Sequence, residues 1–87
     1  MNALELLDII STGETSKVQF KETLPNHESI SREMVAMANT LGGMILLGVQ
    51  DKVGTVTGLT PEQIEYADRK LAEFADNLKP PIYLITE

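Results

Sequence analysis

Apolar residues three or four positions apart predict three amphipathic helices. They span residues 2–13, 29–42 and 60–78. Each begins with a residue whose side chain can cap a helix: Asn2, Ser29 and Thr60. The first two end at glycines suited to a helix C-terminus: Gly13 and Gly42. The third starts with Thr60-Pro61 and has a glutamine able to reach back to the cap, so its onset is the strongest local signal in the chain.

Four other segments are predicted to be β-strands. Lys17–Lys21 alternates polar and apolar residues, so its apolar pair should face inward and its polar residues should share an outer face. The unbroken apolar run Met44–Val49 predicts a central strand covered on both faces. Thr55–Thr57 follows a tight turn and should complete a β-hairpin, and Ile82–Thr86 follows two prolines.

The predicted element order is α-β-α-β-β-α-β, which indicates an α+β fold with a mixed β-sheet packed by helices. A chain of 87 residues allows a single domain, 1–87, with one hydrophobic core. This core should combine apolar residues of the strands and of the third helix: Val18, Phe20, Ile45, Leu47, Val49, Ile64, Leu71 and Phe74. The last strand lacks a partner, so we expect a fragment truncated at the C-terminus that forms a homo-oligomer through its open edge.

The composition excludes several classes of function. With no cysteine and the single histidine His27, the chain has neither a thiolate nucleophile nor the ligands of a structural zinc site, and we expect no cofactor. Its longest apolar run is far shorter than the roughly 20 residues of a membrane span, and its N-terminus is acidic where a signal peptide would be basic. These features predict a cytoplasmic protein with no membrane partner.

The formal net charge of −6 opposes nonspecific attraction to nucleic acid phosphates. The charge is unevenly distributed, because residues 17–58 are neutral overall while both flanking segments are net negative. An anionic partner should therefore contact the basic residues of this middle segment: Lys17, Lys21, Arg32 and Lys52. The first two lie on one face of a predicted strand, where alternation makes their side chains project together.

Three motifs follow one another along the chain. They are Gly13-Glu14 with Val18-Gln19-Phe20-Lys21-Glu22, then Ala36–Gly43, then Met44–Asp51 with Gly54 and Val56-Thr57-Gly58. Together they resemble the Schlafen/AlbA-type DNA-binding domain of prokaryotic transcriptional regulators and Schlafen proteins. The resemblance covers residues 4–87, and the second of the three motifs is its most specific part. It implies a domain that usually continues through further strands.

The same resemblance implies a set of candidate catalytic positions. Nuclease-competent Schlafens use three acidic residues to bind a divalent metal for RNA cleavage. Glu14 matches the first position and Asp51 the third, but Gln19 stands at the second, where the family more often has glutamate. An amide lacks the charge that offsets a hard cation, so we expect neither cleavage nor a bound metal. The chain also lacks the G-x-x-x-x-G-K-[ST] loop of a P-loop ATPase.

Several residues of the second and third motifs are expected to shape the backbone rather than bind a ligand: Asn39, Gly42, Gly43 and Gly48. The leading hypothesis is a non-catalytic module that binds nucleic acid, with DNA favoured over RNA, within a transcriptional regulator. A Schlafen-type metal-dependent nuclease and a structural assembly domain remain the alternatives. Binding through this domain alone should be weak and sensitive to salt.

Overall fold

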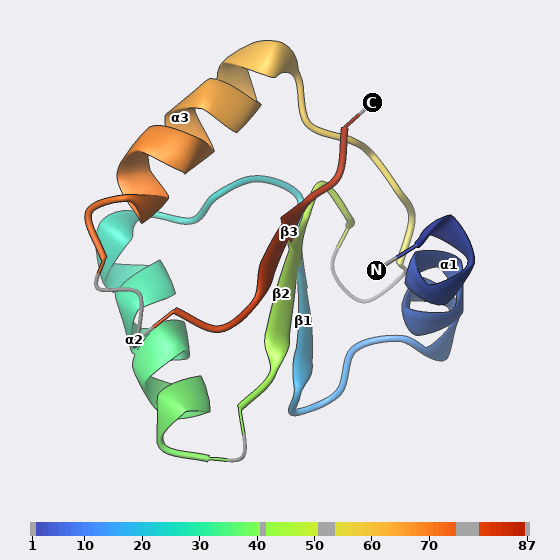
Figure 1. Ribbon diagram of the computed structural model, residues 1–87, viewed down its shortest axis with the longest axis horizontal. Coiled ribbons are helices and arrows are strands. Elements are labelled where there is room, and N and C mark those ends of the chain that lie inside the picture. Colours follow the sequence, from blue (N-terminus) through green and yellow to red (C-terminus); the bar gives the residue numbers. More distant parts are fainter. Residues whose placement is uncertain (1, 41, 51–53, 75–78, 87) are drawn as a thin grey trace.

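A computed structural model describes residues 2–40, 42–50, 54–74 and 79–86. Its elements are α1 (Ala3–Thr12), β1 (Val18–Lys21), α2 (His27–Ala38), β2 (Met44–Leu47), α3 (Pro61–Leu71) and β3 (Ile82–Leu84). Figure 1 shows a central sheet with α1 on one side and with α2 and α3 on the other. The predicted α+β class is confirmed. None of the helices in these ranges is long and apolar enough to cross a lipid bilayer.

The described sheet has three strands in the order β1-β2-β3, and both neighbouring pairs are parallel. The apolar run therefore forms the central strand, as its sequence predicts. Parallel neighbours need long crossover connections, which α2 and α3 provide between successive strands. The predicted hairpin is reduced to one antiparallel bridge between Val49 and Val56, because the chain turns away after Gly58 donates its backbone N–H to the Gly48 carbonyl at 2.9 Å.

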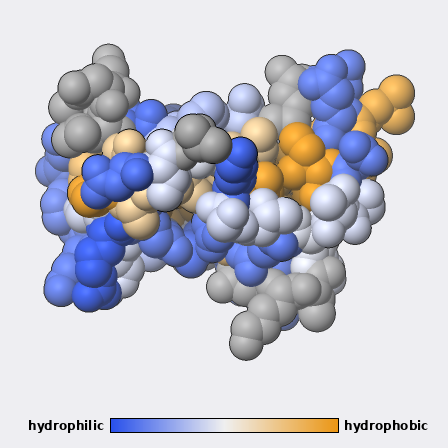
Figure 2. Space-filling view, turned by 90° about the horizontal axis from the view of Figure 1, so that it is seen from below, coloured by the Kyte–Doolittle hydropathy of each residue, from blue (hydrophilic) through white to orange (hydrophobic). Residues whose placement is uncertain are grey.

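The sheet separates two hydrophobic clusters, so the prediction of one shared core is wrong. Successive residues of a strand point to opposite faces, and both faces of this sheet are covered. Ile45 and Leu47 pack with Leu71 beneath α2 and α3, whereas Phe20 and Val49 pack on the α1 side. The α1 layer leaves some apolar surface exposed, and Figure 2 shows hydrophobic residues gathered toward the end of the molecule where α1 lies.

In two of the three described helices, the observed N-cap is the predicted residue. Asn2 accepts the Glu5 backbone N–H, and Thr60 forms a reciprocal capping box with Gln63. The second helix begins three residues earlier than expected, because Asn26 accepts the Ser29 backbone N–H at 2.9 Å and so takes the capping role predicted for Ser29.

The third helix is shorter than predicted. It ends at Leu71, after which Glu73 and Phe74 donate backbone N–H groups to carbonyls only three residues back, at 3.1 Å each. These bonds close a tight turn in place of another helical turn. Part of the predicted extension, residues 75–78, lies outside the described residues.

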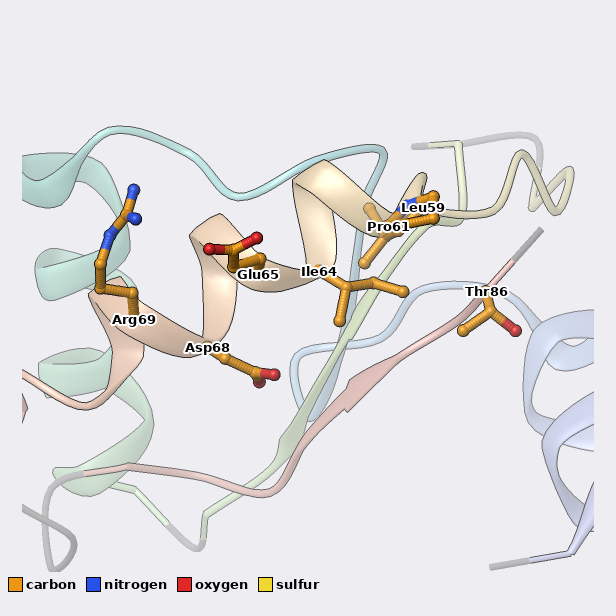
Figure 3. Close-up of a pocket in the computed structure, with 7 residues that line it drawn as sticks. All are labelled: Leu59, Pro61, Ile64, Glu65, Asp68, Arg69 and Thr86. Carbon is orange, nitrogen blue, oxygen red and sulfur yellow. The ribbon is translucent and has the colours of Figure 1, made fainter.

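The outer edge of β3 is open within the described residues. Pro81 and Ile85, on either side of β3, make backbone hydrogen bonds to β2 residues at 3.0 and 2.8 Å, so the backbone groups of Ile82 and Leu84 point the other way. A cleft of about 780 Å³ lies along α3 and reaches Thr86, two residues after β3 (Figure 3). Its lining combines apolar and charged side chains: Leu59, Pro61, Ile64, Glu65, Asp68, Arg69 and Thr86.

Candidate nucleic-acid interface

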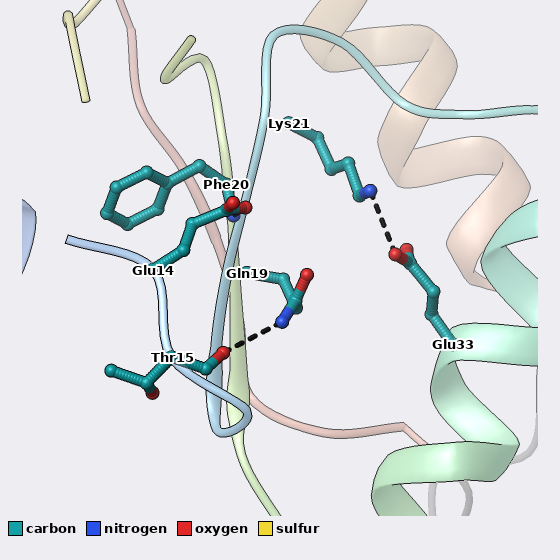
Figure 4. Close-up of polar contacts among 6 residues, drawn as sticks. All are labelled: Glu14, Thr15, Gln19, Phe20, Lys21 and Glu33. Carbon is teal, nitrogen blue, oxygen red and sulfur yellow. Dashed lines mark hydrogen bonds and ion pairs between the residues drawn. The ribbon is translucent and has the colours of Figure 1, made fainter. Parts of the chain in front are cut away.

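The residues matched to the Schlafen nuclease positions lie around the outer edge of β1. The Glu14 carboxylate, just before this strand, accepts the backbone N–H of Phe20 at 2.8 Å (Figure 4). Thr15 exchanges two backbone hydrogen bonds with Val18, at 3.0 and 3.3 Å. Unpaired backbone groups on an edge strand can pair with another chain, so these bonds protect this edge.

Gln19 points away from Glu14. Its amide Nε2 donates to the Thr15 carbonyl at 2.8 Å, and Figure 4 shows its side chain on the α2 side of β1 while Glu14 lies beside Phe20. The candidate third position, Asp51, lies outside the described residues. In the part of the chain that is described, no three histidine, cysteine or acidic side chains gather as a metal site would require.

These two positions do not fit a hard divalent cation. Magnesium takes carboxylate oxygens and water in a near-octahedral arrangement. Here one carboxylate already accepts a backbone N–H, and an amide without charge stands at the second position. Both side chains instead hold the chain segment that leads into β1.

Lys21 is engaged by α2. Its Nζ lies 2.8 Å from Glu33 Oε1, and the two side chains are only 21% and 29% exposed. The other oxygen of this carboxylate, Oε2, is buried without a hydrogen-bond partner. The expected solvent-facing side of β1 is therefore wrong for Gln19 and Lys21, because α2 packs over that side of the strand.

Lys17 and Arg32 have exposed side chains. Lys17 lies immediately before β1, where its backbone is fixed because its carbonyl accepts the Met44 N–H at 2.7 Å. Arg32, on α2, is 71% exposed, and its nearest carboxylate oxygen, on Glu28, is 3.6 Å away. Lys52, the fourth predicted basic contact, lies outside the described residues.

The glycine pair brings β1 and β2 together. Gly42 has a φ of +91°, but it does not end the second helix as predicted, because α2 ends at Ala38 with Asn39 as its C-cap. A Cβ atom at Gly43 would lie 2.6 Å from the Lys17 carbonyl oxygen, the same oxygen that accepts the Met44 N–H. Close approach of two backbones accounts for glycine at this position without a ligand.

Gly48 has a comparable packing role. A Cβ atom there would lie 2.7 Å from the Ile85 carbonyl oxygen, at a φ of +102°. Asn39 is the exposed C-cap of α2. The side-chain bond expected of its amide is made by the next residue, since Thr40 Oγ1 donates to the Met37 carbonyl at 3.0 Å.

A family model described as Schlafen, AlbA_2 matches residues 14–87. The chain belongs to this family. Residue 14 is the glutamate at the first candidate position, so the match begins at the segment whose hydrogen bonds cover the outer edge of β1. No solved structure matches the chain. Membership of the Schlafen/AlbA_2 family points to a function related to nucleic acids.

Sequence reasoning missed a second group of polar and aromatic residues in this Schlafen/AlbA_2 domain. The His27 ring stacks on Phe74 with centroids 4.8 Å apart, and the Arg69 and Lys70 cations lie 5.7 and 5.8 Å from the centre of the Tyr66 ring. The available signal is the adjacent basic pair in the last turn of α3, one turn after a tyrosine. Acidic residues outnumber basic residues in that helix, so its overall charge gave no indication of this basic pair.

Proposed function

We propose that this domain is a non-catalytic module that binds nucleic acid within a transcriptional regulator, with DNA favoured over RNA. Family membership supports the association with nucleic acid. The observation that carries the non-catalytic part is the use of Glu14 and Gln19 in bonds to the backbone around β1. A metal ion would have to compete with the first bond and would gain no charge from the second residue.

The proposed contacts are made to phosphates rather than to bases. Lys17, just before β1, and Arg32, on α2, are exposed cations, and Lys52 completes the set in sequence. Lys21 contributes less, because Glu33 already neutralises its charge at 2.8 Å. Phosphate contacts position a protein without reading sequence, and a net charge of −6 keeps such binding weak.

Fluorescence anisotropy of a labelled DNA duplex across a range of salt concentrations tests this proposal. Two or three phosphate contacts give a slope of log affinity against log salt of about −2 to −3. Lys17→Gln should flatten the slope by about one unit, since each contact contributes about that much. Lys21→Gln is the matched control, because it removes the same charge from the same part of the chain and should leave the slope unchanged. Equal slopes for both variants and the wild type would contradict the proposed contacts.

We also propose that the domain forms a homo-oligomer through β3. The two edges of the described sheet differ, because Glu14 and Thr15 occupy backbone groups of β1 while Ile82 and Leu84 leave theirs open. A second copy can pair with this open edge about a two-fold axis and bury the adjacent apolar cleft. The cleft carries both acidic and basic side chains, so its charge is compatible with a second copy of itself.

Light scattering of two variants at one position tests this assembly. Leu84→Pro removes the outward backbone N–H that a new strand would use, and Leu84→Ala removes the same side chain but keeps the N–H. We expect the wild type and the alanine variant to associate with rising concentration and the proline variant to stay monomeric. A wild type that is monomeric at high concentration would refute the assembly.

A further inference from the structure

A cavity of about 430 Å³ lies between the start of α2 and the end of α3. Figure 1 shows these two helix ends next to each other. The buried Ile30 side chain forms apolar lining, and the ring side chains His27, Tyr66 and Phe74 form other walls. The volume falls within the roughly 300–1,000 Å³ of ordinary small-ligand sites.

Aromatic rings are concentrated here. The chain has two tyrosines, two phenylalanines and one histidine, and three of these five side chains line the cavity. His27 and Phe74 stack on each other with ring planes within 14°, so a base can stack only on the outer face of this pair. Tyr66 is 44% exposed, which leaves its ring accessible from solvent. Flat faces of this kind stack on nucleobases of any sequence.

Two cations and one carboxylate lie beside these rings, and a nucleotide carries groups that each of them can bind. Lys70 lines the cavity, and its Nζ lies 5.8 Å from the centre of the Tyr66 ring. Arg69 adds a second cation at 5.7 Å from the same ring. Glu73 also lines the cavity and offers a carboxylate acceptor for an N–H group on the edge of a base. The adjacent cations favour a ligand that carries negative charge beside its ring.

We infer that this cavity takes up one unpaired base of a single-stranded nucleic acid, with Arg69 and Lys70 contacting the flanking phosphates. The inference rests on the proposed nucleic-acid function and adds a preference for single strands to it. In a duplex the bases are stacked on each other and their faces are hidden, so only an unpaired base can insert between protein side chains.

Anisotropy of labelled oligo(dT), oligo(U) and a DNA duplex tests the cavity, with the intact chain and two variants at one position. Tyr66→Leu keeps apolar volume but removes the ring, and Tyr66→Phe keeps the ring. Stacking of one base on an aromatic side chain predicts that Tyr66→Leu weakens single-strand binding about 5- to 100-fold, while Tyr66→Phe binds like the wild type. Neither variant should change duplex binding.

A base analogue whose fluorescence falls on stacking, 2-aminopurine within the single strand, gives a second readout. Its emission should be quenched by the wild type and by Tyr66→Phe and should be unaffected by Tyr66→Leu. If the wild type binds the duplex but Tyr66→Leu binds single strands as tightly as the wild type, the cavity is refuted and the proposed function stands. If the wild type binds neither single strands nor duplex at low salt, the proposed function itself fails.

Discussion

Replacing Lys21 with glutamine separates a structural role of this residue from a role in phosphate contact. The change removes the cation that faces Glu33 at 2.8 Å and keeps a polar side chain of moderate length. Glu33 then keeps its charge in a partly buried place, where its Oε2 atom already lacks a hydrogen-bond partner. The expected result is a loss of stability rather than a loss of nucleic-acid affinity.

The size of the loss follows from the exposure of the pair. Exposed ion pairs contribute about 0.2–1 kcal/mol. Removing one partner of a fully buried pair costs about 3–5 kcal/mol. With side chains 21% and 29% exposed, this pair lies between the two limits, and we expect Lys21→Gln to lower the free energy of unfolding by about 1–3 kcal/mol. A domain of this length has a total stability of about 4–13 kcal/mol, so the change is measurable.

Urea denaturation followed by far-ultraviolet circular dichroism measures this effect. A double-mutant cycle with Glu33→Gln isolates the coupling, because the double variant leaves no unpaired charge and should recover part of the loss. Lys17→Gln is the control and should leave stability within about 0.5 kcal/mol of the wild type, as expected for an exposed residue. A loss below about 0.5 kcal/mol for Lys21→Gln, together with a flatter salt dependence of DNA binding, would refute this reasoning.

Two further predictions address the core and the absence of catalysis. Phe20→Ala should cost about 3–5 kcal/mol because this ring is fully buried between β1 and α1, and Phe74→Ala should cost clearly less because its ring is only partly buried. Urea denaturation of both variants checks this order, and a reversed order would contradict the difference in burial between the two rings. Incubation with structured RNA or single-stranded DNA and magnesium or manganese should give no cleavage, whereas turnover that Glu14→Ala abolishes would favour the nuclease alternative.

Local sequence signals predicted the elements whose determinants are close together in the chain. Asn2 and Thr60 cap helices because their partners lie three residues away. The central strand follows from an unbroken apolar run, since a strand tolerates such a run when both of its faces are covered. The second helix start was missed because Asn26 and Ser29 are both good caps, and the apolar period begins only at Ile30.

Contacts between distant segments were not accessible to the same reasoning. Alternation along β1 shows that Lys21 and Phe20 face opposite sides of the sheet. It does not show that helices cover both sides, α2 over Lys21 and α1 over Phe20. The ion pair with Glu33 depends on where α2 packs, and the stacking of His27 on Phe74 depends on where α3 ends. Both contacts depend on tertiary packing, which determines the charged residues that a ligand can reach.

The cleft next to β3 and the aromatic cavity both lie along α3, but their linings share no residue. Figure 3 shows that the cleft follows the helix from Pro61 to Arg69, whereas Tyr66 and Lys70 of the same helix line the aromatic cavity. A second copy that buries the cleft would therefore leave the lining of the aromatic cavity uncovered in each copy, but it would cover Arg69, so Lys70 would be the phosphate contact that remains there. Two weak sites on one assembly bind a long strand more tightly than either does alone, because the second contact becomes intramolecular. Assembly through β3 would thus compensate for the weak binding that the acidic charge of a single domain imposes.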